Sequence, residues 1–238
     1  MKQAQFGFWL QQSLLFIGLR PWVWIGYSLF IAVILLLGRI SPLMGIFSAV
    51  VCLFVGVGIA KYIDVNYSSE TPIGFFWAVR QSLPLAIIAG TAVIVFWFVF
   101  MAIANIISGD YYKIGLFFFN WQFTAENLSH QSIHDIASWL YTYADVALIF
   151  SLLMLTTFGS WFSYPLMLFK NYSWSEAKAQ GDWITAKNQK PMYRMLGFIF
   201  IHAVLCASII PLFTPFLYML VSTLMYLSYK DRTAEIKR

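Results

Sequence analysis

Charged residues are scarce in this sequence. Only 11% of its 238 residues are Asp, Glu, Lys or Arg, whereas 61% are apolar and 19% are aromatic. A soluble domain usually carries about 25% charged residues. A chain so poor in charge cannot cover a water-facing surface of its own size. The composition therefore excludes an ordinary soluble domain and indicates one membrane domain over residues 1–238.

Cysteine is equally rare. The two cysteines, Cys52 and Cys206, each lie in the middle of a long apolar run. A disulfide framework needs an oxidising compartment, so we expect both thiols to be buried as small packing residues. The N-terminal region also lacks the small-residue cleavage site of a secretory signal peptide, and its first apolar run is therefore expected to stay in the membrane.

The sequence motifs of several enzyme and nucleotide-binding classes are missing. No Gly-x-Ser-x-Gly, Walker or dinucleotide-binding glycine pattern occurs. Gly56 and Gly58 lie in the middle of an apolar run, where small residues favour close helix packing. We therefore predict no cofactor and no catalytic residue.

Long apolar runs dominate what is present. A helix needs roughly 20 apolar residues to cross the hydrocarbon core, and six runs approach that length: 22–38, 42–60, 84–107, 146–169, 192–210 and 212–229. Arg194, near the start of the fifth run, is the one charged residue inside them, and it can snorkel to the interface. The sequence predicts an all-α polytopic membrane protein with six transmembrane helices.

Helix-compatible stretches precede three of the predicted spans. They cover 6–20, 73–83 and 174–190, and each is followed by a proline, at Pro21, Pro84 and Pro191. The pattern indicates a degenerate threefold repeat, in which a cytoplasmic interfacial helix precedes a helical hairpin. The alternative is coincidence, because proline is common in the first turn of any helix.

The distribution of cations predicts the orientation. Thirteen of the Lys and Arg residues fall on the side of the N-terminus, and only Arg39 and Lys113 fall on the other. The positive-inside rule then predicts a bacterial inner-membrane protein with both termini in the cytoplasm and a basic cytoplasmic loop at 170–191. Insertion and anionic lipid headgroups account for the net charge of +5, and no nucleic-acid partner is predicted.

The predicted outer segment, 108–145, is too long for a simple turn. Its first half is rich in aromatic residues, and its second half has the pattern of an amphipathic helix on the outer leaflet. The triplet at 117–119 points in several directions, so a flat membrane surface cannot cover it. We expect Phe117, Phe119 and Trp121 to contact another membrane protein subunit or the chain's own outer helix.

One group of residues in this segment has metal-ligand character. Glu126, His130 and His134 are spaced four apart, so they share one face of a helix. Such a pair of histidines can bind Zn or Cu, but no third histidine and no cysteine lies nearby. We favour the polar face of an interfacial helix and predict no bound metal.

Three polar residues lie in or beside the predicted spans: Asn105, Asp145 and His202. Asp145 immediately precedes the fourth span, where an acid caps a helix and complements its dipole. An intramembrane histidine is a functional candidate by default. We nevertheless interpret Asn105 and His202 as structural, with His202 hydrogen-bonded to a neighbouring helix.

Several short motifs carry a family resemblance. They are Tyr164-Pro165-Leu166, Ser175-Glu176-Ala177, the segments 186–191 and 226–231 and, more loosely, Arg20-Pro21-Trp22. The chain resembles uncharacterised six-span bacterial inner-membrane proteins, akin to the membrane domains attached to some glycerophosphodiester phosphodiesterases. The resemblance implies six spans with cytoplasmic pre-span helices. It implies no catalytic residues, and the phosphodiesterase domain itself is absent.

The expected function is that of a non-enzymatic membrane component in contact with the lipid bilayer. It would be an accessory or assembly subunit, or a factor that organises lipid and envelope complexes. One alternative is a transporter or channel for a neutral or lipidic substrate. Only His202, Pro211 and Pro215 favour it. The second alternative is a metal-dependent membrane enzyme built on the outer acid and histidines.

Overall fold

The computed structural model describes residues 5–39, 41–68, 73–109 and 141–236. The regular structure of these residues is helical, which confirms the all-α prediction for them. The helices are α1 (Phe6–Leu19), α2 (Pro21–Ile34), η1 (Leu35–Arg39), α3 (Pro42–Ser68), α4 (Phe75–Ser108), α8 (Thr142–Thr157), α9 (Ser163–Lys170), α10 (Trp174–Lys187), α11 (Gln189–Ser208), η2 (Pro211–Phe213) and α12 (Thr214–Ile236).

Within the described ranges, five helical segments are long and apolar enough to cross a membrane. They are Pro21–Arg39, Pro42–Tyr67, Phe75–Ser108, Gln189–Ser208 and Pro211–Thr233, and they overlap five of the six predicted spans. This supports a multi-pass membrane protein. The predicted fourth span, 146–169, is instead divided between α8 and α9, with a break at residues 158–162. Six spans are therefore not confirmed.

The break between α8 and α9 coincides with a contact from α10. The backbone N–H groups of Phe158 and Gly159 both donate to the Met154 carbonyl, at 2.9 and 3.2 Å, which closes the last turn of α8. A Cβ atom added to Gly159 would lie 3.1 Å from the indole of Trp174. The missing side chain therefore lets the first residue of α10 pack against the chain at this point.

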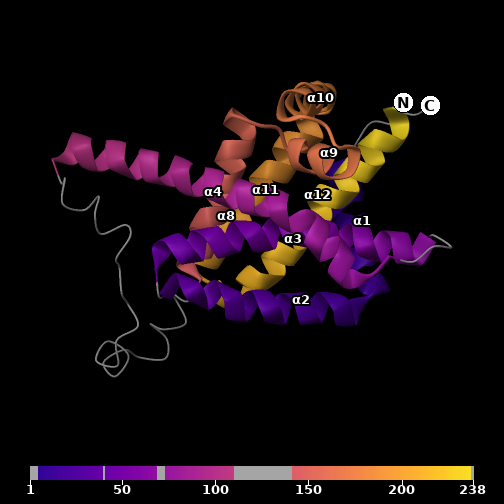
Figure 1. Ribbon diagram of the computed structural model, residues 1–238, viewed down its shortest axis with the longest axis horizontal. Coiled ribbons are helices and arrows are strands. Elements are labelled where there is room, and N and C mark those ends of the chain that lie inside the picture. Colours follow the sequence, from indigo (N-terminus) through magenta and orange to yellow (C-terminus); the bar gives the residue numbers. More distant parts are fainter. Residues whose placement is uncertain (1–4, 40, 69–72, 110–140, 237–238) are drawn as a thin grey trace.

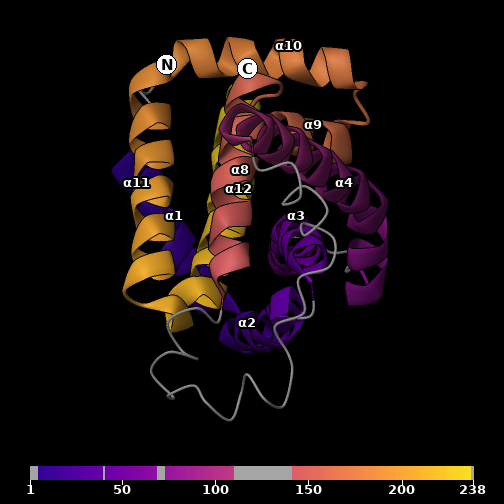
Figure 2. The same cartoon turned by 90° about the vertical axis from the view of Figure 1, so that its left-hand side faces the viewer.

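The helices cross one another instead of forming one parallel bundle. In Figure 1, α2, α3 and α4 run along the long axis of the molecule. Figure 2 shows α3 end-on, whereas α8 and α11 run vertically in the plane of that view. The central helix α3 packs against α4, α8 and α12. The predicted arrangement of three hairpins is therefore not confirmed.

Only two of the three predicted helix boundaries at proline occur. A break at Arg20 separates α1 from α2, which begins at Pro21, and α10 and α11 are separated at Asn188, three residues before Pro191. The boundary predicted at Pro84 is wrong, because α4 continues through this residue. Proline is tolerated inside membrane helices where neighbouring groups satisfy the freed backbone. In the turn before Pro84, the Tyr164 hydroxyl donates to the Ser82 carbonyl at 3.2 Å, which connects α9 to α4.

Buried hydrogen bonds connect α12 to α8 and to α3. Tyr218 donates to the Ala144 carbonyl at 2.6 Å, and Ser222 donates to the Leu53 carbonyl at 2.7 Å. Cys52 and Cys206 are buried free thiols, as predicted. Gly56 and Gly58 lie in close contact with other helices, which also agrees with the sequence interpretation.

Candidate functional site

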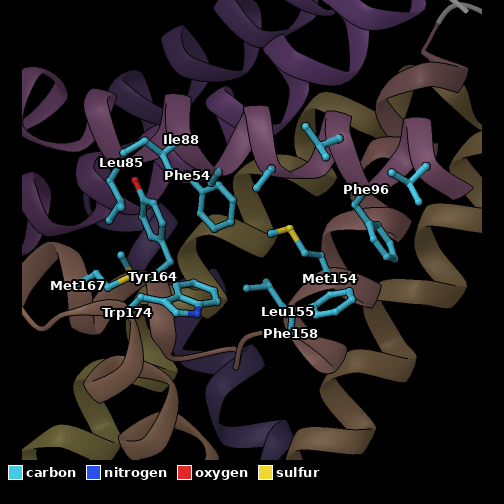
Figure 3. Close-up of a pocket in the computed structure, with 14 residues that line it drawn as sticks. Phe54, Leu85, Ile88, Phe96, Met154, Leu155, Phe158, Tyr164, Met167 and Trp174 are labelled. Carbon is cyan, nitrogen blue, oxygen red and sulfur yellow. The ribbon is translucent and has the colours of Figure 1, made fainter.

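An apolar pocket of about 580 Å³ lies between α4 and the α8–α9 segment. We call it the tail pocket. As Figure 3 shows, α4 forms one side, Met154, Leu155 and Phe158 form the opposite side, and Tyr164 and Trp174 lie near one end. Its lining is almost entirely apolar.

The α4 side of the tail pocket is a stripe along one helix face. Leu85, Ala92 and Val99 are spaced by seven residues, which places them on the same face. Ala89 lies on the same side and, with Ala92, leaves the wall hollow between larger neighbours. Ile88, also in the lining, is 63% exposed. The tail pocket is therefore open toward the surroundings of α4.

Aromatic contacts hold one end of the tail pocket in place. The rings of Phe54 and Tyr164 are stacked with centroids 4.1 Å apart, and the Tyr164 hydroxyl is fixed on the Ser82 carbonyl. Met154 and Met167, by contrast, are unbranched and polarisable side chains that adapt to irregular shapes. The aromatic contacts therefore fix one end of the tail pocket, whereas the methionine side chains can adapt to the shape of a ligand.

A second pocket of about 350 Å³ adjoins the tail pocket. We call it the polar pocket, because three of its lining side chains are polar. The two share Leu85 and Met167, and the polar pocket is also lined by Gln81, Asn171 and Tyr172. Asn171 ends α9 in the left-handed conformation, with φ of 54°, a position that asparagine tolerates better than most residues. The amides and the phenol supply hydrogen-bond donors and acceptors without a formal charge.

Asp145 does not have the role predicted for it. The cap position of α8 is occupied by Tyr141, and Asp145 lies within the first turn. Its side chain is fully buried, and the Thr214 hydroxyl lies 3.0 Å from each carboxyl oxygen. Asp145 therefore connects α8 to α12.

The other two polar candidates are also away from the tail pocket. Nδ1 of His202 lies 2.8 Å from the Phe198 carbonyl, and its ring packs on Phe198 with centroids 3.9 Å apart. The predicted bond to a neighbouring helix is thus replaced by one to the preceding turn of the same helix. The Asn105 carbonyl accepts from the Ser108 hydroxyl at 3.2 Å, near the end of α4.

The candidates of the outer segment lie outside the described residues. These are the metal candidates Glu126, His130 and His134 and the partner-binding candidates Phe117, Phe119 and Trp121. Among the residues that are described, no group of three or more His, Cys, Asp and Glu side chains could hold a metal ion.

The tail pocket was not predicted from the sequence. The segment 84–107 is apolar on all sides, so its hydrophobic pattern does not single out the face at Leu85, Ala92 and Val99. Two alanines three residues apart, Ala89 and Ala92, were the only local signal of a hollow in this helix.

The fold defines the class of this chain as a multi-pass helical membrane protein. Comparisons with models of known protein families, with curated proteins and with solved structures found no match. The resemblance to the membrane domains of certain phosphodiesterases stays a prediction, and the function has to be inferred from the chain's own geometry.

Proposed function

We propose that this protein binds a membrane lipid and acts as a non-enzymatic, lipid-organising component of the membrane. A hydrocarbon chain of the lipid occupies the tail pocket, and its polar head lies in the adjoining polar pocket. The observation that carries the proposal is the shared border of the two pockets at Leu85 and Met167. An apolar cavity next to a more polar one matches the two parts of an amphipathic molecule.

The surroundings of the tail pocket favour a ligand that arrives from the bilayer. The volume of about 580 Å³ is within the usual range of small-molecule sites, roughly 300–1,000 Å³. The exposed side chains of Ile88, Val95 and Val99 border it, so a lipid chain reaches it without crossing water.

The affinity for a lipid must come from the fit of its chain to the tail pocket and from polar contacts with its head. A lipid chain in the bilayer is already in hydrocarbon, so its transfer into an apolar pocket yields no hydrophobic free energy. Close packing against the stacked Phe54–Tyr164 pair supplies dispersion energy. Gln81, Asn171 and Tyr172 supply both donors and acceptors, which suits a head with hydroxyl groups such as glycerol or a sugar.

We also propose a bacterial inner-membrane location, with α10 on the cytoplasmic side. The charged side chains of Glu176, Asp182 and Lys187 on this helix are exposed, so it belongs in contact with water or headgroups. The predicted role as an accessory or assembly subunit, through Phe117, Phe119 and Trp121, is compatible with lipid binding and stays a prediction.

The proposal is tested by crosslinking lipids with photoreactive chains to the full-length protein in nanodiscs. We expect crosslinks to concentrate on α4 residues 85–99 and on residues 154–158 at the end of α8. Ala92→Phe fills the tail pocket and should remove most of these crosslinks. Ala104→Phe is the matched control, because Ala104 is an exposed residue of the same helix outside the pocket. Crosslinks spread evenly over the lipid-facing helices, or unaffected by Ala92→Phe, would contradict the proposal.

A transporter of a lipidic substrate is the second candidate. The observation that favours it is the fully buried carboxyl of Asp145, since ionisable groups inside membrane proteins often couple substrate movement to ions. The test is the movement of a fluorescent lipid between leaflets of proteoliposomes. Movement that requires the protein and is lost in Asp145→Asn would favour transport, and its absence in the wild type would exclude it.

A further inference from the structure

A third pocket, of about 820 Å³, lies where the last turn of α10 and the first turns of α11 and α1 meet. We call it the cationic pocket. Lys187 of α10 and Lys190 and Arg194 of α11 line it, and none of its lining residues is acidic. Lys190 and Arg194 are four residues apart and therefore project from one face of α11.

The three cations are not neutralised by neighbouring carboxylates. Across the described ranges, the salt bridges join Lys178 to Asp182, Lys230 to Asp64 and Arg232 to Asp231. The Lys187 ammonium lies 3.6 Å from the centroid of the Trp183 ring, a contact that orients it without removing its charge. Like charges gathered in a concave surface create a strong positive potential. The positive potential in the cationic pocket therefore favours the binding of an anion.

Backbone groups add to this potential. Phe6 and Gly7 of α1 and Gln189 and Lys190 of α11 line the cationic pocket, and all four belong to first turns, whose N–H groups have no acceptor within the helix. Neither cap residue supplies one from its side chain. The Asn188 side chain instead donates to the Ile184 carbonyl at 2.8 Å. Helix starts of this kind favour negative charge.

The surface next to the cationic pocket favours a lipid as the source of the anion. The rings of Phe6 and Phe198 pack with centroids 5.3 Å apart, which joins α1 to α11 beside the pocket. Farther along α11, Phe200, Ile201 and Val204 are exposed apolar side chains. The phosphate of a lipid would bind in the cationic pocket, and its hydrocarbon chains would contact the exposed apolar side chains of α11.

We propose that the cationic pocket, formed by Lys187, Lys190, Arg194 and the first turns of α1 and α11, binds the phosphate of an anionic phospholipid headgroup. Basic pockets between membrane helices recognise such headgroups through charge. This site is separate from the tail pocket and the polar pocket, which share none of its lining residues and contain no formal charge among theirs.

The test is a lipid titration of the full-length protein in mild detergent, with bound lipid counted by native mass spectrometry. Phosphatidylglycerol and phosphatidylcholine with identical chains are compared, and we expect phosphatidylglycerol to bind more tightly. Replacing both Lys190 and Arg194 with Gln should weaken phosphatidylglycerol binding roughly thirty-fold and leave phosphatidylcholine binding unchanged. The matched control replaces Arg20 and Lys170 with Gln. Both are exposed cations outside the pocket, and this variant should retain wild-type binding.

A second variant changes the space in the pocket without changing its charge. Gly7 has no atom within 4 Å of the position of an added Cβ, so Gly7→Leu is accommodated by the fold and narrows the pocket. It should weaken phosphatidylglycerol binding, whereas Ala92→Phe in the tail pocket should not. Equal affinity for the two lipids, or an equal loss in the control, would overturn the proposal. Wild-type affinity for phosphatidylglycerol in Gly7→Leu would also overturn it.

Inorganic phosphate distinguishes the two possible sources of the anion. If the lipid is the ligand, phosphate alone should leave the thermal unfolding temperature unchanged while phosphatidylglycerol raises it, and only in proteins with Lys190 and Arg194 intact. An equal rise with inorganic phosphate would overturn the lipid assignment and identify a free phosphate site.

Discussion

Gly56 of α3 lies directly against Ser222 of α12. A Cβ atom on Gly56 would be 2.7 Å from the Cβ of Ser222, and closer still to the hydroxyls of Ser222 and Tyr27. The Ser222 hydroxyl also donates to the Leu53 carbonyl of α3. The separation of the two most buried long helices thus depends on a residue without a side chain.

We therefore predict that Gly56→Ala lowers stability. The added methyl group must displace Ser222 or Tyr27, and overpacking of this kind typically costs about 1–3 kcal/mol. Thermal unfolding in detergent measures the effect. Gly26→Ala is the control, because Gly26 is an exposed helix residue with open space around it. That change should stabilise the protein by up to about 1 kcal/mol. Equal unfolding temperatures for the two variants would contradict the observed contact.

The contact between Asp145 and Thr214 leads to a second prediction. Asp145→Asn keeps an oxygen that accepts from the Thr214 hydroxyl, so its unfolding temperature should stay close to that of the wild type. Asp145→Ala removes the acceptor and leaves a gap in a fully buried site, which should cost about 1–3 kcal/mol. Asp182→Ala, at an exposed position, is the control and should have a small effect. An unchanged unfolding temperature in Asp145→Ala would show that the contact adds no stability.

The start of α10 gives a prediction that depends on pH. Ser173 and Glu176 form a reciprocal capping box, and hydrogen bonds from the Ser173 side chain and backbone lower the pKa of Glu176 below its ordinary value of 4.5. A lowered pKa in the folded state means that the stabilisation is fully present above pH 4.5 and is lost as the pH falls through the folded-state pKa. Amide hydrogen exchange in α10 should therefore accelerate at acidic pH relative to a Glu176→Gln variant at the same pH.

Ser173→Ala checks the same capping box from its other side. Loss of the cap should cost the helix about 1 kcal/mol at neutral pH and should increase exchange in the first turn of α10. Gln180→Ala serves as the control, since Gln180 lies in the middle of α10, away from the capping box. Identical exchange in both variants would show that α10 is held by its packing alone.

The orientation in the membrane is a fourth prediction. Reporter tags at Lys2, near Ser69, near Gln180 and at Arg238 should all be accessible from the cytoplasm, and a tag near Gln131 from the opposite side. The reason is the charge bias of the segments between the apolar runs. A tag near Gln180 that reports the outer side would overturn the orientation, because residues 170–191 hold four of the thirteen cations predicted to be cytoplasmic.

The sequence by itself determined the class of this protein and the positions of most of its long helices. Apolar length is a local property, so the runs at 22–38, 42–60, 84–107, 192–210 and 212–229 could be found without knowledge of their neighbours. Burial of Cys52 and close packing at Gly56 could likewise be predicted, because both lie in the middle of an apolar run.

Only the tertiary structure decided where helices end within apolar sequence and where pockets form between them. The break after Thr157 coincides with a contact between Gly159 and Trp174 of α10. The partner of Asp145, Thr214, likewise comes from another helix. The tail pocket lies between α4 and the α8–α9 segment, and the cationic pocket lies where α1 begins beside the α10–α11 junction. Each of these depends on contacts between separate helices, which hydrophobic periodicity along one helix does not encode.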